Sequence, residues 1–133
     1  MLELRWVWSD AWVLWSIAAG STELTNLQQL ISAADYLNHA VPTYAELAGA
    51  LGRLVAAGCV ERTGRGYRAS TTIREVLAAV RTPRSSGLAE VDALFAHLET
   101  LEAVGAMDKA LSRSAYRRAV DEYTGGRRAS ESE

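Results

Sequence analysis

The sequence of 133 residues contains a single cysteine, Cys59, so no disulfide bond can form within the chain. It also lacks a long apolar run, because the longest uncharged stretch lies between Asp10 and Glu23 and is too short to span a bilayer. We therefore expect no secretory signal, no membrane span and a reducing, cytoplasmic location. With 49% apolar and 23% charged residues, the composition is typical of a soluble globular domain.

The recognisable patterns of catalytic and metal sites are missing as well. The sequence shows no phosphate-binding glycine loop, no nucleophile elbow and no zinc-ligand spacing. Asp35 and His39 lie four residues apart and could form a metal pair or an acid–base dyad, but the other histidine, His97, is distant in sequence. The alternative is a structural role, in which the His39 and Asn38 side chains hydrogen-bond to the last carbonyls of a helix and Asp35 orients the imidazole of His39. We expect no enzymatic activity, no metal and no cofactor.

Lysine is also scarce, since Lys109 is the only lysine among 14 basic residues. We attribute this to codon bias rather than to recognition chemistry. The formal charge is −4 over residues 1–52, +5 over residues 53–84 and −3 over residues 85–133. The basic middle is either an electrostatic footprint for an anionic partner or a solvated surface.

The first half of the chain has helical patterning. Residues 11–19 form an apolar run between Ser9-Asp10 and Gly20, which predicts a helix. Trp12 and Trp15 share one face of it, and we expect that face to pack in the core rather than on a partner. Residues 2–8 alternate in polarity and predict an extended arm, docked on the domain or on a second copy.

Two further helices are each preceded by a capping box. Thr25 and Gln28 predict a helix to about residue 38, which stops before Pro42. Thr43 and Glu46 predict the next helix, to about residue 57. The short break between the two helices makes them a helix-turn-helix.

A hairpin and another helix follow. Residues 59–62 and 66–69 predict short strands, joined by a turn with Gly64 and Gly66. Thr72 and Glu75 form a further capping box, which opens a helix to about residue 80. We therefore assign residues 1–80 to one domain with an N-terminal arm, and residues 81–87 to a linker.

The C-terminal part, residues 88–124, is expected to be helical. Apolar residues recur at spacings of three and four over residues 88–104, which predicts an amphipathic helix of about five turns that Gly105 ends. This helix either folds back onto the domain or pairs with its copy in a second subunit, and we expect a homodimer. A second helical segment ends at Gly125, and the tail, residues 125–133, is expected to be disordered.

Residues 51–62 resemble a segment of a known protein family. Their sequence is Leu-Gly-Arg-Leu-Val-Ala-Ala-Gly-Cys-Val-Glu-Arg. It is similar to the end of the recognition helix and the first wing strand in winged-helix regulators of the MarR and PadR type. The resemblance covers about residues 9–80. It implies a mainly α fold with a small β-hairpin wing, a winged helix-turn-helix followed by C-terminal helices. It also implies a dimeric transcription regulator whose third helix enters the major groove and whose wing contacts phosphates or the minor groove.

Two functions follow from this reading. In the first, the helix-turn-helix and wing bind double-stranded DNA, although Arg53 is the only base-reading side chain on the outer face of the third helix. In the second, the protein is a protein–protein interaction module, with a partner against the small residues Ala45, Gly49 and Gly52; those residues could equally reflect composition. The residues expected to contact DNA are Thr43, Arg53, Arg62, Arg65, Arg68 and Arg74.

Overall fold

The computed structural model describes residues 5–20, 24–103 and 111–132, and over these residues the chain forms six helices and one hairpin. In chain order the elements are α1 (Trp8–Ala18), α2 (Leu27–Asn38), α3 (Tyr44–Ala56), β1 (Val60–Thr63), β2 (Gly66–Ala69), α4 (Thr71–Val80), α5 (Gly87–Leu98) and α6 (Arg113–Ser132). The expected class is confirmed: the fold is mainly α, with a small antiparallel hairpin after the third helix and further helices after the hairpin.

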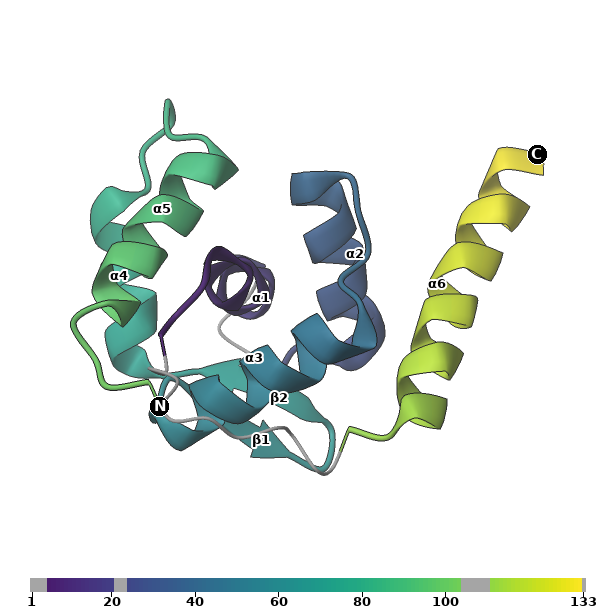
Figure 1. The fold of residues 1–133 in the computed structure, drawn as a ribbon. Helices are drawn as coiled ribbons and strands as arrows, with labels where there is room; N and C mark the ends of the chain where they lie inside the picture. Colours follow the sequence, from purple (N-terminus) through teal and green to yellow (C-terminus); the bar gives the residue numbers. More distant parts are fainter. Residues whose placement is uncertain (1–4, 21–23, 104–110, 133) are drawn as a thin grey trace.

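Helix α1 lies at the centre of the fold. It packs against α2, α3, α4, α5 and β2, and every residue from Asp10 to Ala18 is buried. Figure 1 shows α1 nearly end-on, with α4 and α5 on one side, α2 on the other, and α3 and the hairpin below. A helix that is mostly apolar all round belongs in such a position. Trp12 and Trp15 are 3% and 8% exposed, so both pack inward as expected.

The N-terminal residues pack on their own domain. Helix α1 begins at Trp8, earlier than expected, because Asp10 lies at its third position and accepts the Val7 N–H at 2.9 Å. Trp6 is buried, and its Nε1–H donates to the Leu101 carbonyl at 3.1 Å. The described part of the expected arm therefore docks on this chain, while residues 1–4 lie outside the described residues.

The cap of α2 lies one residue later than predicted. Asn26 Oδ1 accepts the Gln29 N–H at 2.8 Å, and Gln29 Oε1 accepts the Asn26 N–H at 2.9 Å. Thr25 instead forms an antiparallel bridge with Tyr67, and its hydroxyl donates to the Ile17 carbonyl. Thr25, which the local pattern assigns to the cap of the helix, is thus used for strand pairing instead.

The cap of α3 is the one predicted. Thr43 Oγ1 accepts the Glu46 N–H at 3.1 Å, and Glu46 Oε1 accepts the Thr43 N–H at 2.9 Å. These two bonds satisfy donors that the first turn of a helix leaves without a partner. Helices α2 and α3 therefore form the expected pair around a short break.

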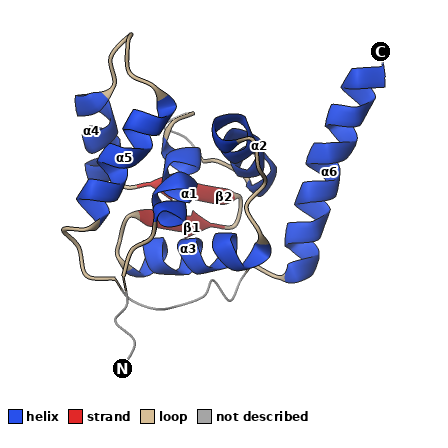
Figure 2. Cartoon of the chain, turned by 45° about the horizontal axis from the view of Figure 1, so that its top comes forward, coloured by secondary structure: helices blue, strands red, loops and turns tan. Residues whose placement is uncertain are grey.

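The hairpin lies beside α3 and, in the view of Figure 2, behind α1, against which β2 packs. Val60 pairs with Ala69 and Arg62 with Tyr67, and Val60, Tyr67 and Ala69 are buried against the core. Gly66 has a φ of +151°, and a Cβ atom there would lie 2.5 Å from the Thr25 carbonyl oxygen. Glycine is required at this position because the Thr25 backbone packs directly on the strand.

The start of α4 and the end of α5 differ from those predicted from the sequence. Ser70, not Thr72, caps α4: its Oγ accepts the Ile73 N–H at 3.2 Å. Helix α5 ends at Leu98, short of the five turns expected, and Leu101 packs on the core from a non-helical segment. Residues 104 and 105 lie outside the described residues. The apolar side of α5 packs against α1 and α4, which fits the alternative in which it folds back onto the domain.

Helix α6 packs along the side of α2, away from α1 (Figure 1). Its backbone is helical through Ser132, so the expected end at Gly125 is wrong. In the described residues, no helix is both long and apolar enough to cross a membrane.

Candidate nucleic-acid interface

The hairpin, the first turn of α4 and the residues around the end of α3 border an open concavity of about 550 Å³. Three of the residues predicted to contact DNA line it together: Arg62, Arg68 and Arg74. Arg62 and Arg68 are exposed, whereas Arg74 is half-buried. Arginines from β1, β2 and α4 thus border one hollow, with Arg62 on the face of the hairpin that carries Tyr67 and Arg68 on the face that carries Glu61.

The N-terminus of α4 adds positive potential to the same hollow. Ser70 and Thr71, the cap and first residue of α4, belong to the lining. The first N–H groups of a helix carry the positive end of its dipole, which favours an anion nearby. Glu61 also lines the hollow and lies directly across the hairpin from Arg68, so it offsets part of this charge.

Contacts within the chain orient two of these arginines. The Arg62 guanidinium lies 6.0 Å from the centre of the Tyr67 ring. Burial raises the pKa of the Tyr67 hydroxyl, and the charge of Arg62 opposes that rise. Arg74 Nη2 donates to Thr71 Oγ1 at 3.3 Å, which directs its side chain toward the cap of α4.

Arg65 and Arg68 are two accessible arginines of the hairpin. Arg65 lies at the tip of the hairpin, where its backbone N–H donates to Thr63 Oγ1 at 3.2 Å. Both arginine side chains are exposed, and within the part of the chain that the structure describes no ion pair holds either one. Both can therefore meet a phosphate without breaking a described ion pair.

The structure does not bring Thr43 and Arg53 to this hollow. Thr43 uses its hydroxyl to cap α3. Arg53 points back to α1, where its Nη2 lies 2.6 Å and its Nε 3.0 Å from Oδ1 of the buried Asp10. Sequence reasoning missed this pairing because Asp10 resembles an ordinary acidic residue at the start of a helix.

The small-residue face of α3 is covered by the chain itself. Residues 47–52 are all buried, including Gly49 and Gly52, while Ala45 is exposed. A Cβ atom at Gly49 would lie 3.2 Å from Arg53 Nη1, so the guanidinium lies across this glycine. Part of the face expected to meet a partner therefore accommodates an internal ion pair.

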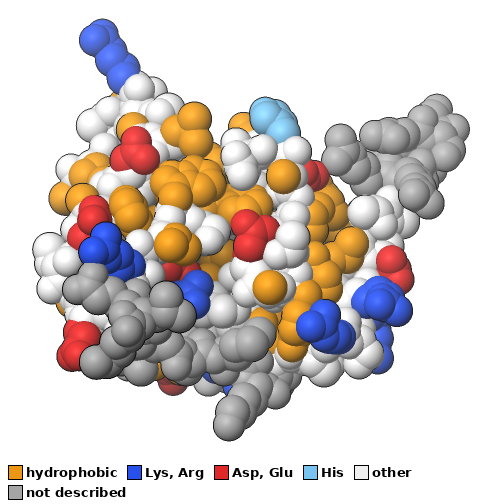
Figure 3. Space-filling view, in the orientation of Figure 1, with side chains coloured by type: hydrophobic (Ala, Val, Ile, Leu, Met, Phe, Trp, Pro, Cys, Tyr) orange, Lys and Arg blue, Asp and Glu red, His pale blue; other side chains and the backbone are white. Residues whose placement is uncertain are grey.

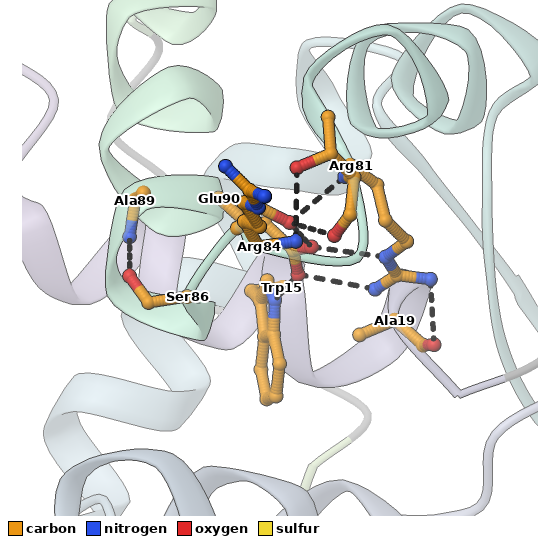
Figure 4. A network of polar contacts seen from close by, with 9 residues as sticks. Trp15, Ala19, Arg81, Arg84, Ser86, Ala89 and Glu90 are labelled. Carbon is orange, nitrogen blue, oxygen red and sulfur yellow. Dashed lines mark hydrogen bonds and ion pairs between the residues drawn. The ribbon is translucent and has the colours of Figure 1, made fainter.

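A second buried acid binds another arginine of the basic segment (Figure 4). Glu90 on α5 accepts the Trp15 Nε1–H at 2.9 Å and two bonds from Arg81, at 3.0 and 3.1 Å. Arg81 Nη1 also reaches the Ala19 carbonyl at 3.4 Å. Hydrogen bonds from Arg81, joined by that from Trp15, lower the pKa of Glu90 although burial opposes the shift. Arg81 therefore ties α1, the end of α4 and α5 together.

The contact between Asp35 and His39 that the structure gives is made by the backbone. His39 ends α2 in the left-handed conformation, with φ of 55°, and its backbone N–H donates to the Asp35 carbonyl at 2.7 Å. The Asp35 carboxylate accepts the hydroxyl of Tyr123 from α6. Among the described residues, no three histidine, cysteine or acidic side chains are grouped to hold a metal ion.

Comparisons with protein families, with curated proteins and with solved structures find no match to this chain. On the face shown in Figure 3, basic side chains are separated by apolar and uncharged ones. The hollow between the hairpin and α4 brings together three of the six residues predicted to contact DNA.

Proposed function

We propose that the protein is a winged-helix module that binds the phosphate backbone of duplex DNA through its hairpin and the start of α4. The element order supports this: a helix pair around a short break, then a hairpin, with Thr25 bridged to β2 as a further short extended segment. The single observation that carries the proposal is the hollow lined by Arg62, Arg68 and Arg74.

The proposed contacts are with the backbone rather than with bases. Base readout needs arginine, lysine, asparagine or glutamine side chains that reach into a groove. In α3, Arg53 is held by Asp10, and Ala45 and Ala56 are the exposed residues within the helix. The arginines around the hairpin supply the sequence-independent contacts that position a protein on DNA.

The charge available for these contacts is smaller than the sequence suggests. Of the seven arginines in residues 53–84, Arg53 and Arg81 are paired with buried acids from other elements. Non-specific binding of this kind has dissociation constants of about 1–100 µM at physiological salt. Affinity should fall steeply with salt, because each neutralised phosphate adds about 0.9 to the slope of log K against log salt.

Fluorescence anisotropy of a labelled mixed-sequence duplex, at low and then at moderate salt, tests the proposal. The variant Arg62→Ala/Arg65→Ala/Arg68→Ala should lose most of its affinity, and its salt slope should fall by about 2 to 3. The matched control is Arg84→Ala/Arg117→Ala/Arg118→Ala, which removes three exposed arginines elsewhere. An equal loss of DNA affinity in both variants would indicate only a response to net charge. An unchanged affinity of the triple hairpin variant would refute the proposed interface.

Because Arg62 packs over Tyr67, a second variant separates binding from stability. Arg65→Ala/Arg68→Ala changes only exposed side chains, and its melting temperature should match that of the parent. It should still weaken binding by about tenfold, since it removes two phosphate contacts.

The second candidate is the protein–protein interaction module without DNA binding. The specific observation in its favour is the burial of residues 47–52 of α3, which leaves little of that helix for a groove. Gly49 is not a usable probe of a partner surface, because a larger residue there would disturb Arg53. The exposed Ala45 is usable: Ala45→Arg should abolish capture of a partner without lowering stability. Absence of DNA binding even at low salt favours this candidate.

A further inference from the structure

Helix α6 is held against the start of α3 by a set of contacts between specific groups. The Tyr116 hydroxyl donates to the Pro42 carbonyl at 2.5 Å, and the Tyr44 hydroxyl donates to the Leu111 carbonyl at 2.7 Å. The Arg113 guanidinium lies 4.5 Å from the centre of the Tyr44 ring. The Tyr44 and Tyr116 rings meet edge to face, with centroids 5.8 Å apart.

These contacts occupy one side of the start of α3, at Pro42 and Tyr44, while Thr43 and Ala45 stay exposed. Pro42 lies in the break between α2 and α3, and Tyr44 is the first residue of α3. In helix-turn-helix proteins the N-terminal residues of the second helix contact the base edges. In this chain Arg113 contacts Tyr44 and Tyr116 bonds to Pro42, and Figure 2 shows the start of α6 beside one end of α3.

Helix α6 is also attached differently from the other helices. Helices α2 to α5 all pack on α1, whereas α6 packs on α2. Ala119 is 6% exposed in α6, while Arg117, Arg118 and Asp121 are exposed. One face of α6 is therefore used for docking and the other is solvated. Release of α6 would uncover Leu111, Ala115 and Tyr116 at the edge of the core but would leave α2 to α5 packed on α1.

We propose that α6 is an autoinhibitory helix, which in its docked position keeps the start of α3 away from duplex DNA. This inference rests on the proposed function. Docked, the protein binds the backbone weakly through the hairpin; with α6 released, Tyr44 and the first turn of α3 approach the groove as well. The apparent affinity then depends on the fraction of molecules in which α6 is released.

The proposal predicts a gain of affinity from changes that weaken docking. Tyr116→Phe removes one hydrogen bond and keeps the ring, so the released fraction, and with it the affinity for duplex, should rise about fivefold. Tyr36→Phe is the matched control, because Tyr36 is 81% exposed on α2. Its affinity should equal that of the parent.

A charge placed in the α2–α6 interface gives a sharper test. Ala119→Glu should release α6 and raise affinity even though it adds a negative charge, which by simple electrostatics weakens DNA binding. Ser114→Glu adds the same charge at an exposed position of α6 and should bind no more tightly than the parent. Amide hydrogen exchange on the full-length variants reports whether α6 has been released, and circular dichroism reports whether the rest remains folded.

The outcomes separate the inference from the function on which it rests. Tighter binding by Ala119→Glu, with α6 exchanging rapidly, supports the autoinhibitory helix. If the parent binds duplex DNA and Ala119→Glu, with α6 released, binds it with the same affinity, the inference is overturned and the proposed function stands. If neither parent nor released variant binds duplex at low salt, the proposed function fails and the inference fails with it.

Discussion

Arg53 on α3 binds the carboxylate of Asp10 on α1, with 2.6 Å between Nη2 and Oδ1. Asp10 is fully buried, and its Oδ2 also accepts the Val7 N–H at the start of α1. The guanidinium reaches this site by lying across Gly49. The pair thus fixes the start of α1 against α3, and a residue that pattern alone assigns to DNA readout has a structural role.

Removal of Arg53 should therefore destabilise the protein. Arg53→Ala leaves a buried carboxylate without its cation, and we expect a loss of about 3 kcal/mol in the free energy of unfolding. Urea denaturation followed by tryptophan fluorescence measures this loss. Arg65→Ala is the control, since an exposed arginine should change stability by less than about 0.5 kcal/mol. Equal stability of the two variants would show that the ion pair contributes little.

The sequence predicted the elements well where the signal was local and periodic. Thr43 and Glu46 cap α3 as expected, and Trp12 and Trp15 pack in the core. The caps of α2 and α4 were misplaced because several capping residues lie side by side, and contacts distant in sequence decide between them. Thr25 pairs with Tyr67, so the cap of α2 passes to Asn26.

The site was predictable only in part, for the same reason. The hairpin arginines are close in sequence, and a turn between two short strands was sufficient to group Arg62 and Arg68. Arg53 could not be excluded from the site by sequence, nor Arg81 from the basic charge of residues 53–84, because the buried acids Asp10 and Glu90 lie on other helices. Nor does the apolar spacing of residues 88–104 reveal where α5 ends, since Leu101 packs on the core without being helical.

The two glycines of the hairpin turn should tolerate substitution very differently. A Cβ atom at Gly66 would meet the Thr25 carbonyl at 2.5 Å, while one at Gly64 would meet nothing within 4 Å. Gly66→Ala should cost more than about 2 kcal/mol through backbone strain, and Gly64→Ala less than about 1 kcal/mol. Thermal melting of the two variants checks the difference. Similar melting temperatures would mean that the Thr25–Tyr67 bridge is not rigid.

The thiol of Cys59 should react slowly while the protein is folded. Cys59 is 3% exposed between α3 and β1, and burial raises the pKa of its thiol, which lowers the thiolate fraction. We expect modification by a disulfide reagent such as DTNB to be slow in buffer and to become fast across the urea unfolding transition. Rapid modification in buffer would show that the segment between α3 and β1 opens locally.

Glu90 should make the stability depend on acid pH. Its pKa is lowered chiefly by the hydrogen bonds from Arg81, so the folded state holds the proton less tightly than the unfolded state, in which the pKa is about 4.3. The stabilisation is therefore complete above that value and is lost as the pH falls through the lower pKa of the folded state. Glu90→Gln should be less stable than the parent at neutral pH, and the difference should shrink as the pH falls below about 4.3. Urea titrations of both proteins at several pH values measure the difference, and the exposed Glu122→Gln should show no such convergence. A difference that stays constant with pH would mean that Glu90 acts through its shape and neutral hydrogen bonds rather than through its charge.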